Sequence, residues 1–207
     1  LCCGRPYYDF GLLERAQAAL ARALEVLAPQ LERGLPIVVL EPGCLSVFRD
    51  ELRQLFADDP RAARLAGSVT SLSELLLKKQ VRIERESRVL MHTHCHQKAL
   101  WGASADLQLL QSAGCQVAAP DTGCCGMAGS FGYRPEFYAA SKRIAGLALL
   151  PALEGARERL VVANGFSCRE QIEALSARPT LHLAELLADG ADGTGHDRRK
   201  NLLKSQN

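Results

Sequence analysis

The chain has 207 residues, of which 47% are hydrophobic and 23% are charged, and its formal net charge is +2. This composition supports a sizeable hydrophobic core and argues against a wholly disordered chain. Basic and acidic residues are interspersed, which argues against nucleic-acid binding, and no apolar run is long enough to predict a transmembrane segment.

The sequence begins inside a cysteine motif, with no signal peptide before it. We therefore expect it to be the C-terminal part of a longer protein. The absence of a secretory signal predicts a cytoplasmic location, with peripheral attachment to the inner membrane as the alternative.

The first half alternates between predicted helix and strand. Apolar residues at helical spacing predict a helix over 9–27, which Pro29 is expected to break. The apolar run PIVVL (36–40) predicts a buried strand. SVFRDELRQLF (46–56) predicts a second helix, so Cys44 falls in the turn between strand and helix.

The rest of the chain continues this alternation. SRVLMHTHCHQKAL (87–100) predicts a strand, a turn that contains Cys95, and the start of a helix. The turn GFSC, which ends at Cys168, follows another predicted strand. The remaining predicted elements are, in chain order, a helix over 103–114, a strand over 115–120, a helix from 135 that ends at Pro151, a strand over 159–164 and a helix over 169–175. This pattern predicts an α/β fold, with a largely parallel sheet and flanking helices.

The two halves repeat one plan, which indicates an internal duplication. Cys-Cys-Gly at 2–4 returns at 124–126, and a single cysteine follows each glycine after 40 and 42 positions. SLSELL and HLAELL then occupy matching places. We predict a first repeat over residues 1–88, a second over 89–188, and a disordered polar tail over 189–207.

The placement of the eight cysteines argues against a disulfide framework. A chain of this size does not need such staples, and Cys124 and Cys125 are adjacent. Cys44, Cys95 and Cys168 each follow a predicted strand, and sites in parallel sheets gather at the carboxyl ends of the strands. Repeated cysteine placement without a secretory context points to metal or redox chemistry.

The second repeat supplies four thiols at one predicted sheet edge. Four thiolates suit a 4Fe–4S cluster or a structural zinc ion. An adjacent pair with two single ligands from distant loops favours the larger cluster, and Gly123 and Gly126 leave room beside the pair. The predicted metal ligands are Cys95, Cys124, Cys125 and Cys168.

The first repeat supplies only three equivalent thiols, from Cys2, Cys3 and Cys44. We predict that these are ligands of a second site. By the repeat, its fourth ligand is expected upstream of Leu1.

Residues around the ligands are candidates for supporting roles. His92, His94 and His96 alternate around Cys95, and we predict that they donate hydrogen bonds to sulfur or cap the following helix. Histidine can also ligate a cluster directly. Arg169 follows Cys168, where its charge would raise a cluster potential unless it is simply solvated. Cys115 has no counterpart in the first repeat and is predicted to be a buried, inert thiol.

Five segments together resemble the cysteine-rich CCG domain: CCGRPYYDFG, EPGCLSVFRDEL, HTHCHQKAL, GCCGMAGSFGY and GFSCREQI. This domain occurs in heterodisulfide reductases, in iron–sulfur components of glycolate-, lactate- and glycerol-3-phosphate-oxidising enzymes, and at the C-terminus of long FAD-linked oxidases. The wording of the last three segments is most similar to that last group.

The resemblance implies an oxidoreductase component that passes electrons from reduced FAD, through a 4Fe–4S cluster, to an acceptor. The substrate of the parent enzyme would be a 2-hydroxyacid such as lactate, glycolate or 2-hydroxyglutarate. The implied partners are an FAD-binding module and a ferredoxin-like module of the same chain or complex. This chain has no G-x-G-x-x-G motif after a strand, so we expect FAD to bind elsewhere.

The chain departs from the heterodisulfide reductase pattern at two positions. Each repeat of that family ends in Cys-x-x-Cys, whereas Val47 and Gln171 occupy the second cysteine position here. This favours an ordinary relay cluster. The alternatives are a redox component of the heterodisulfide reductase type that acts on thiols and disulfides, a zinc-bound or metal-free docking module, and a thiol switch that pairs Cys124 or Cys125 with Cys168.

Overall fold

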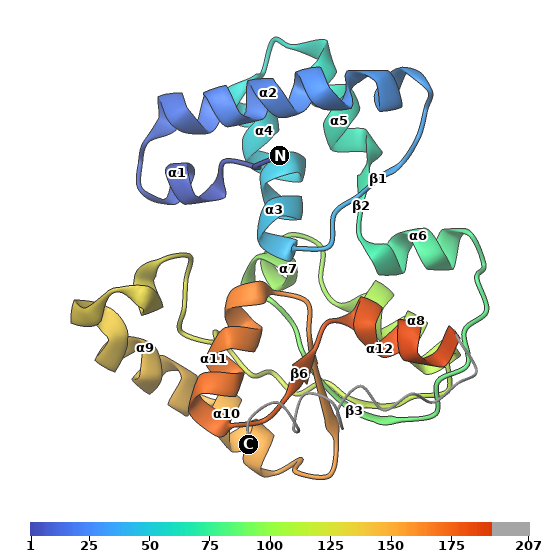
Figure 1. Ribbon diagram of the computed structural model, residues 1–207, viewed down its shortest axis with the longest axis vertical. Helices are drawn as coiled ribbons and strands as arrows, with labels where there is room; N and C mark the ends of the chain where they lie inside the picture. Colours follow the sequence, from blue (N-terminus) through green and yellow to red (C-terminus); the bar gives the residue numbers. More distant parts are fainter. Residues whose placement is uncertain (192–207) are drawn as a thin grey trace, which may run out of the picture.

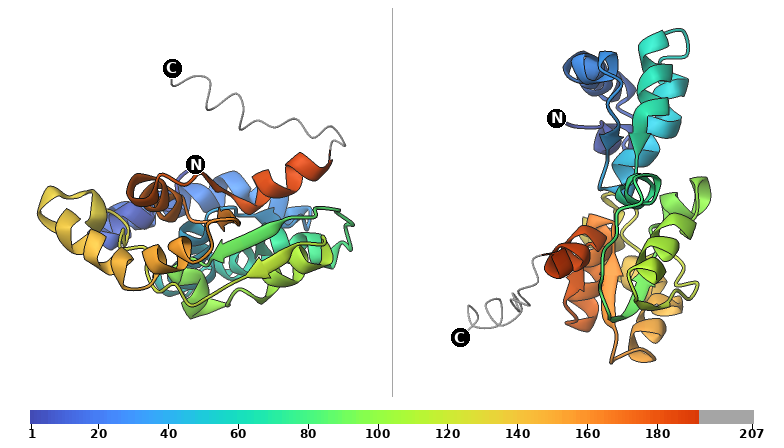
Figure 2. Two further views of the ribbon diagram at one scale, coloured as in Figure 1. Left: turned by 90° about the horizontal axis from the view of Figure 1, so that it is seen from below. Right: turned by 90° about the vertical axis from the view of Figure 1, so that its right-hand side faces the viewer.

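The computed structural model describes residues 1–191, which form two lobes arranged along the long axis (Figures 1 and 2). The first lobe contains α1 (Arg5–Asp9), α2 (Leu13–Glu32), β1 (Ile37–Val38), α3 (Pro42–Ser46), the π-helical turn η1 (Val47–Glu51), α4 (Leu52–Leu55), α5 (Pro60–Ser68) and β2 (Val69–Thr70). α6 (Leu72–Lys78) leads to the second lobe, which contains β3 (Arg88–His92), α7 (Cys95–Leu100), α8 (Ser104–Ser112), β4 (Gln116–Ala118), the 3₁₀ turn η2 (Phe131–Tyr133), α9 (Pro135–Leu147), α10 (Leu149–Glu154), β5 (Leu160–Ala163), α11 (Phe166–Ser176), β6 (Thr180–Leu181) and α12 (Leu183–Ala191).

The predicted fold class is confirmed, although the strands form two sheets. One sheet pairs β1 with β2, the other has the order β4-β3-β5-β6, and every pair is parallel. Helices flank both sheets (Figure 1). Among the described residues, no helix combines the length and the apolar character that a membrane span requires.

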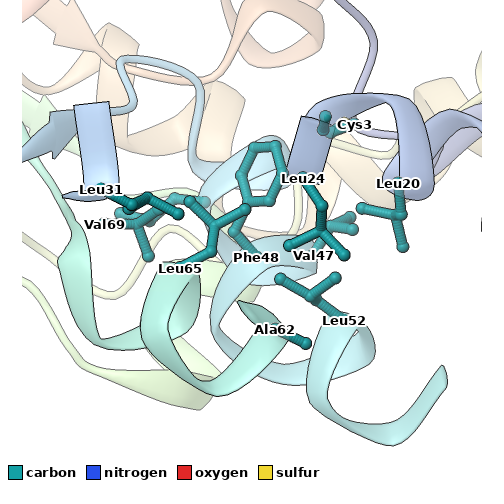
Figure 3. Packing of buried hydrophobic residues seen from close by; sticks show 12 residues of the cluster. Cys3, Leu20, Leu24, Leu31, Val47, Phe48, Leu52, Ala62, Leu65 and Val69 are labelled. Carbon is teal, nitrogen blue, oxygen red and sulfur yellow. The ribbon is translucent and has the colours of Figure 1, made fainter. Parts of the chain in front are cut away.

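Helices supply most of the core of the first lobe (Figure 3). α2 buries Leu20 and Leu24 completely, four positions apart on one helix face. Phe48 from η1 and Leu52 from α4 pack against this face, and Leu65 closes the cluster from α5. This core holds the segment that carries Cys44 against the long helix α2.

The sheet of the second lobe is covered on both faces. Val89 and Met91 of β3 pack in one hydrophobic cluster with α8 and α12. Leu90 packs in the other cluster with residues of α10 and α11. β5 divides its side chains in the same way, with Val162 on one face and Val161 on the other. Burial on both faces explains why these strands are continuously apolar.

The two lobes share an order of elements that fits the predicted duplication. β1, α3, β2 and α6 follow one another in the first half, as β5, α11, β6 and α12 do in the second. Each strand pair is parallel, with Ile37 opposite Val69 and Val161 opposite Thr180. The exact repeat boundaries stay a prediction. Of the predicted tail, residues 189–191 belong to α12, and the remainder lies outside the described residues.

Neither proline ends a helix where the sequence predicts it. α2 continues past Pro29 to Glu32, because Pro29 lies in the last turn, where the helix loses only one hydrogen bond to the proline. α10 includes Pro151 in its first turn, where a backbone N–H has no acceptor within the helix. The break comes earlier, at Ala148, between α9 and α10.

The first sheet is smaller and more exposed than predicted. Only Ile37 and Val38 of the run PIVVL form a strand, and the predicted burial of Val38 and Leu40 is wrong, since their exposures are 37% and 51%. Ile37 and Val39 pack on the helical core of the lobe. Because successive strand side chains point to opposite faces, a two-stranded sheet covered on one face exposes every second residue.

A buried carboxylate lies where the lobes meet. Asp106 of α8 accepts hydrogen bonds from Ser73 of α6, from Gln97 Nε2 at 2.7 Å and from Asn164 Nδ2 at 3.1 Å. Asn164 in turn accepts from the backbone N–H of Leu183 at 3.2 Å. Burial raises the pKa of Asp106, despite the hydrogen bonds from Gln97 and Ser73. This polar cluster joins α6, α7, α8 and the end of β5.

Candidate metal centre

The four cysteines of the second repeat meet at the carboxyl edge of the four-stranded sheet. Cys95 is the first residue of α7, and two residues separate it from His92, where β3 ends. Cys124 and Cys125 lie in the loop that follows β4, and Cys168 lies in the first turn of α11, after β5. Cys95 and Cys168 therefore belong to helix starts rather than to turns, as does Cys44 in α3.

Their thiols form a continuous chain of interacting groups. Cys95 interacts with Cys124, Cys124 with Cys125, and Cys125 with Cys168. The sulfurs of Cys125 and Cys168 and a ring nitrogen of His92 all lie within 4.8 Å of one another. All four cysteines are free thiols, and Cys125 and Cys168 are buried in the core. The structure thus brings Cys125 and Cys168 together with His92, and Cys95 and Cys124 continue the chain of thiols beside them without joining that close group.

The thiols differ sharply in acidity because they share protons. Hydrogen bonds from Cys125 and then Cys95 lower the pKa of Cys124 to about 2. The hydrogen bond from Cys125 lowers the pKa of Cys168 to about 6, against the effect of burial. The same interactions raise the pKa of Cys95 and Cys125. The four thiols therefore ionise unequally, and those that are still protonated would release their protons when they bind a metal as thiolates.

His92 has an unpaired nitrogen beside these sulfurs. Its Nδ1 lies 2.6 Å from the hydroxyl oxygen of Thr122. Its Nε2 is buried and has no hydrogen-bond partner among the described residues. Buried polar atoms are nearly always paired, and the nearby sulfur of Cys168, whose pKa Cys125 and then the His92 ring lower, is the partner toward which this nitrogen is placed.

Two glycines allow the close packing of this site. A Cβ on Gly126 would lie 2.2 Å from the backbone oxygen of Ser141 in α9. A Cβ on Gly165 would lie 2.4 Å from the ring of His94 and 3.1 Å from the sulfur of Cys168. Gly126 also donates its backbone N–H to the sulfur of Cys124 at 3.3 Å. These positions therefore fix the backbone around the thiols and exclude larger residues.

His94 caps the helix that begins with Cys95. It is the N-cap residue of α7, and its Nδ1 accepts the backbone N–H of His96 at 3.2 Å. Burial, together with the nearby His96 and His92, lowers the pKa of His94 to about 4. The ring is therefore neutral in the folded chain at neutral pH.

Replacing His94 with asparagine is expected to reduce the loss of unfolding free energy that the metal-free chain suffers as the pH falls below 6.5. Between pH 6.5 and 4 the unfolded chain binds a proton that the folded chain excludes, so wild-type stability falls by about 3 kcal/mol on this account. Asparagine keeps an N-cap acceptor but does not titrate. Urea unfolding of both chains at pH 7, 5.5 and 4.5 measures the difference, and parallel pH curves would contradict the prediction.

The first repeat forms a second, partial site. The sulfurs of Cys3 and Cys44 lie 2.9 Å apart, and the backbone N–H of Gly4 lies 3.4 Å from the sulfur of Cys2, matching the contact of Gly126 with Cys124. The hydrogen bond with Cys44 lowers the pKa of Cys3 to about 7 and raises that of Cys44. Cys2 is exposed to solvent.

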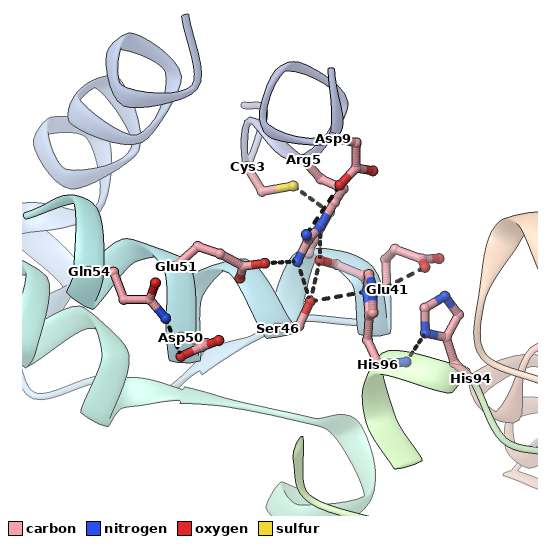
Figure 4. Close-up of polar contacts among 12 residues, drawn as sticks. Cys3, Arg5, Asp9, Glu41, Ser46, Asp50, Glu51, Gln54, His94 and His96 are labelled. Atoms are coloured by element: carbon pink, nitrogen blue, oxygen red, sulfur yellow. Dashed lines mark hydrogen bonds and ion pairs between the residues drawn. The ribbon is translucent and has the colours of Figure 1, made fainter. Parts of the chain in front are cut away.

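Arg5 connects this site to the second lobe (Figure 4). Its guanidinium lies 2.6 Å from Glu51 Oε1 and donates to Ser46 Oγ at 2.7 Å. Ser46 Oγ lies 3.4 Å from Nδ1 of His96, which comes from α7 of the other lobe. The three neighbouring histidines therefore face different partners: His92 the sulfurs, His94 its own helix, and His96 the first lobe.

The other residues singled out in the sequence have structural contacts. Arg169 donates to the backbone oxygens of Ala163 and Asn164 at 3.0 and 2.8 Å. Cys115 is buried, and its thiol donates to the backbone oxygen of Arg85 at 2.9 Å. Thr122 and Gly165 were not among the predicted site residues, although a glycine directly before the helix turn that carries Cys168 is a signal that the sequence contains.

Val47 and Gln171, which replace the fifth cysteines of the heterodisulfide reductase pattern, are also structural. Val47 is buried in the core of the first lobe. Gln171 is buried in α11 and donates to the hydroxyl of Ser141 at 2.9 Å. Each position is therefore filled by a well-packed side chain.

Sequence comparison relates the chain to named proteins. D-2-hydroxyglutarate dehydrogenase of Pantoea ananatis (strain AJ13355) is 24% identical over 188 residues, which are 90% of this chain and 18% of that protein. One component of the anaerobic glycerol-3-phosphate dehydrogenase of Escherichia coli (strain K12) is 28% identical over 203 residues, 90% of this chain and 48% of that protein. The chain is similar to dehydrogenase components.

A third relative matches less of the chain. Lactate utilization protein A of Shouchella clausii (strain KSM-K16) is 29% identical over 143 residues, 63% of this chain and 58% of that protein. No family model matches the chain. The chain spans less than half the length of the two dehydrogenase relatives described above, and the comparisons support a general oxidoreductase role.

Proposed function

We propose that the chain is an iron–sulfur electron-transfer domain, in which Cys95, Cys124, Cys125 and Cys168 hold a 4Fe–4S cluster. The observation that carries the proposal is the meeting of these four thiols, from three chain segments, at one sheet edge. When bound, such a cluster supplies one-electron transfer. Cys2, Cys3 and Cys44 are proposed as ligands of a second cluster.

The residues present fit such a group. The donor set is four sulfurs, and hydrogen bonds from neighbouring thiols lower the pKa of Cys124 and Cys168. The free Nε2 of His92 can donate a hydrogen bond to sulfur while Nδ1 accepts from Thr122. The core around Cys125 and Cys168 excludes water from one side of the site.

The names of the relatives support a place in 2-hydroxyacid or glycerol-3-phosphate oxidation. We propose that the parent enzyme is a flavin-linked 2-hydroxyacid dehydrogenase or oxidase, whose reduced FAD is the electron source. The FAD-binding module, a ferredoxin-like module and the electron acceptor would be partners of this domain. The chain itself carries no dinucleotide-binding motif.

Anaerobic reconstitution of the full chain with ferrous iron and sulfide tests the proposal. We expect about four irons and four sulfides at each complete site, and an EPR signal of a reduced 4Fe–4S cluster after dithionite treatment. Fewer than about three irons per chain would overturn the 4Fe–4S assignment.

A structural zinc site is the second candidate, because one observation favours it. His92, Cys125 and Cys168 already converge within 4.8 Å, which is a donor set that suits zinc. Stoichiometric zinc in protein purified without air, together with failure to take up iron, would show that the site is a structural zinc site.

A further inference from the structure

One carboxylate in the first lobe caps two helices. Glu41 is the N-cap residue of α3, and its Oε1 accepts the backbone N–H of Gly43 at 3.3 Å. Its Oε2 accepts the backbone N–H of Phe166, the first residue of α11, at 2.8 Å. Phe166 lies 125 positions further along the chain, in the other lobe.

These two helices are the equivalent ones of the two repeats. α3 carries Cys44 as its third residue, and α11 carries Cys168 as its third residue. The N-cap residue of α11 is Gly165, which has no side chain and provides no cap hydrogen bond. The first N–H of α11 therefore depends on Glu41 for its acceptor.

The surroundings make the first turn of α11 sensitive to this cap. Cys168 is 1% exposed, and Gly165 is packed against the ring of His94. The side chain of Asn164, directly before this glycine, donates to Asp106 and accepts the backbone N–H of Leu183. Its backbone oxygen accepts from Arg169. Cys168 and Arg169 of this turn are held within the second lobe, whereas the N–H of Phe166 takes its acceptor from the first lobe.

We propose that Glu41 is a positioning residue for both cysteine sites, because it fixes the first turns that carry Cys44 and Cys168. The first lobe thereby supports the ligand geometry of the second-repeat site. The effect on metal binding rests on the proposed function, whereas the effect on thiol placement does not.

Thiol reactivity of the metal-free chain tests the placement. In Glu41→Ala we expect Cys168 to react with iodoacetamide roughly tenfold faster than in wild type, because losing the cap bond to the N–H of Phe166 favours local opening by about that factor. Mass spectrometry gives the rate at each cysteine, and Cys115 in the same chain is the internal reference. Far-UV circular dichroism checks that the variant is folded.

Asp59→Ala is the matched control. Asp59 is also an N-cap carboxylate of the first lobe, accepting the N–H of Arg61 at 2.8 Å, but its helix α5 carries no cysteine. We expect its Cys168 rate to stay within twofold of wild type. Equal Cys168 rates in Glu41→Ala and Asp59→Ala would overturn the proposal.

Glu41→Gln separates the two caps and serves if the alanine variant fails to fold. Its amide has one acceptor oxygen, so one of the two N–H groups loses its partner. Loss of the carboxylate charge lowers the pKa of both thiols and speeds both reactions slightly. We expect a large increase only at the cysteine whose helix loses its cap bond, either Cys44 or Cys168. Unchanged rates at both cysteines would contradict the proposal.

Iron uptake tests the consequence in a Cys44→Ser background, where the first-repeat site has lost a ligand. We expect Glu41→Ala to lower the iron content at least twofold, whereas Asp59→Ala leaves it unchanged. Equal iron contents would overturn the link to the second-repeat site. If the Cys44→Ser chain takes up no iron at all, the proposed function fails, and the alkylation rates still decide the role of Glu41.

Discussion

Serine in place of Cys125 is expected to leave the second-repeat site with less than one iron per chain, against about four in the parent protein. The sulfur of Cys125 interacts with both Cys124 and Cys168, so its loss removes the link between the other ligands. A serine hydroxyl does not ionise near neutral pH and is a poor ligand for iron. Iron and sulfide analysis after anaerobic reconstitution, in the Cys44→Ser background, gives the result.

Cys115→Ser provides the matched control for this loss. Cys115 is also a buried free thiol of the second lobe, but it contacts the backbone oxygen of Arg85 and none of the other sulfurs. We expect this variant to retain its full iron content. Retention of about four irons by Cys125→Ser, with an unchanged EPR spectrum, would show that Cys125 is not a ligand.

Alanine in place of Gly126 is expected to destabilise the folded chain by about 3 kcal/mol, which combines backbone strain and overpacking. Gly126 has a φ of +92°, and a Cβ would lie 2.2 Å from the backbone oxygen of Ser141. The clash is with helix backbone, which cannot rotate away as a side chain can. Urea unfolding measures the loss, and reconstitution should show reduced iron because the same loop carries Cys124 and Cys125.

Gly146→Ala, in the same helix α9 that Gly126 contacts, is the control. A Cβ there meets nothing within 4 Å, and the residue lies inside the helix. We expect it to be neutral or to stabilise the chain by up to about 1 kcal/mol. If both glycine variants unfold at the wild-type urea midpoint, the close approach of Gly126 to α9 does not limit stability.

Local sequence patterns predicted most elements of the fold, because their signals are short-range. Continuous apolar runs marked β3 and β5, which are buried on both faces. The predicted length and burial of the first strand were too large, because the apolar run PIVVL does not distinguish a strand buried on both faces from one that exposes Val38 and Leu40. The helix ends predicted from prolines were also wrong, because Pro29 and Pro151 lie in terminal turns, where a missing N–H is tolerated.

The candidate site could be predicted as a set of residues but not as a geometry. Because sites in parallel sheets gather at the carboxyl ends of the strands, the sequence predicted that Cys95, Cys124, Cys125 and Cys168 lie close together. The division of roles among His92, His94 and His96 could not be foreseen, because it depends on where β3 stops and α7 starts. Glu41 was equally hidden, since its second partner comes from a distant segment in the other lobe.

The buried cluster around Asp106 has a consequence for how the chain unfolds. Stacked repeats often lose structure one unit at a time, because each touches its neighbour through a simple apolar surface. Here the carboxylate keeps two donors, from α7 and the end of β5, within its own lobe, and takes the third from Ser73 of α6, the helix that links the lobes. Unfolding of the first lobe that pulled α6 away would leave the buried carboxylate one donor short. The described chain should therefore melt more nearly as one unit than its duplicated plan suggests.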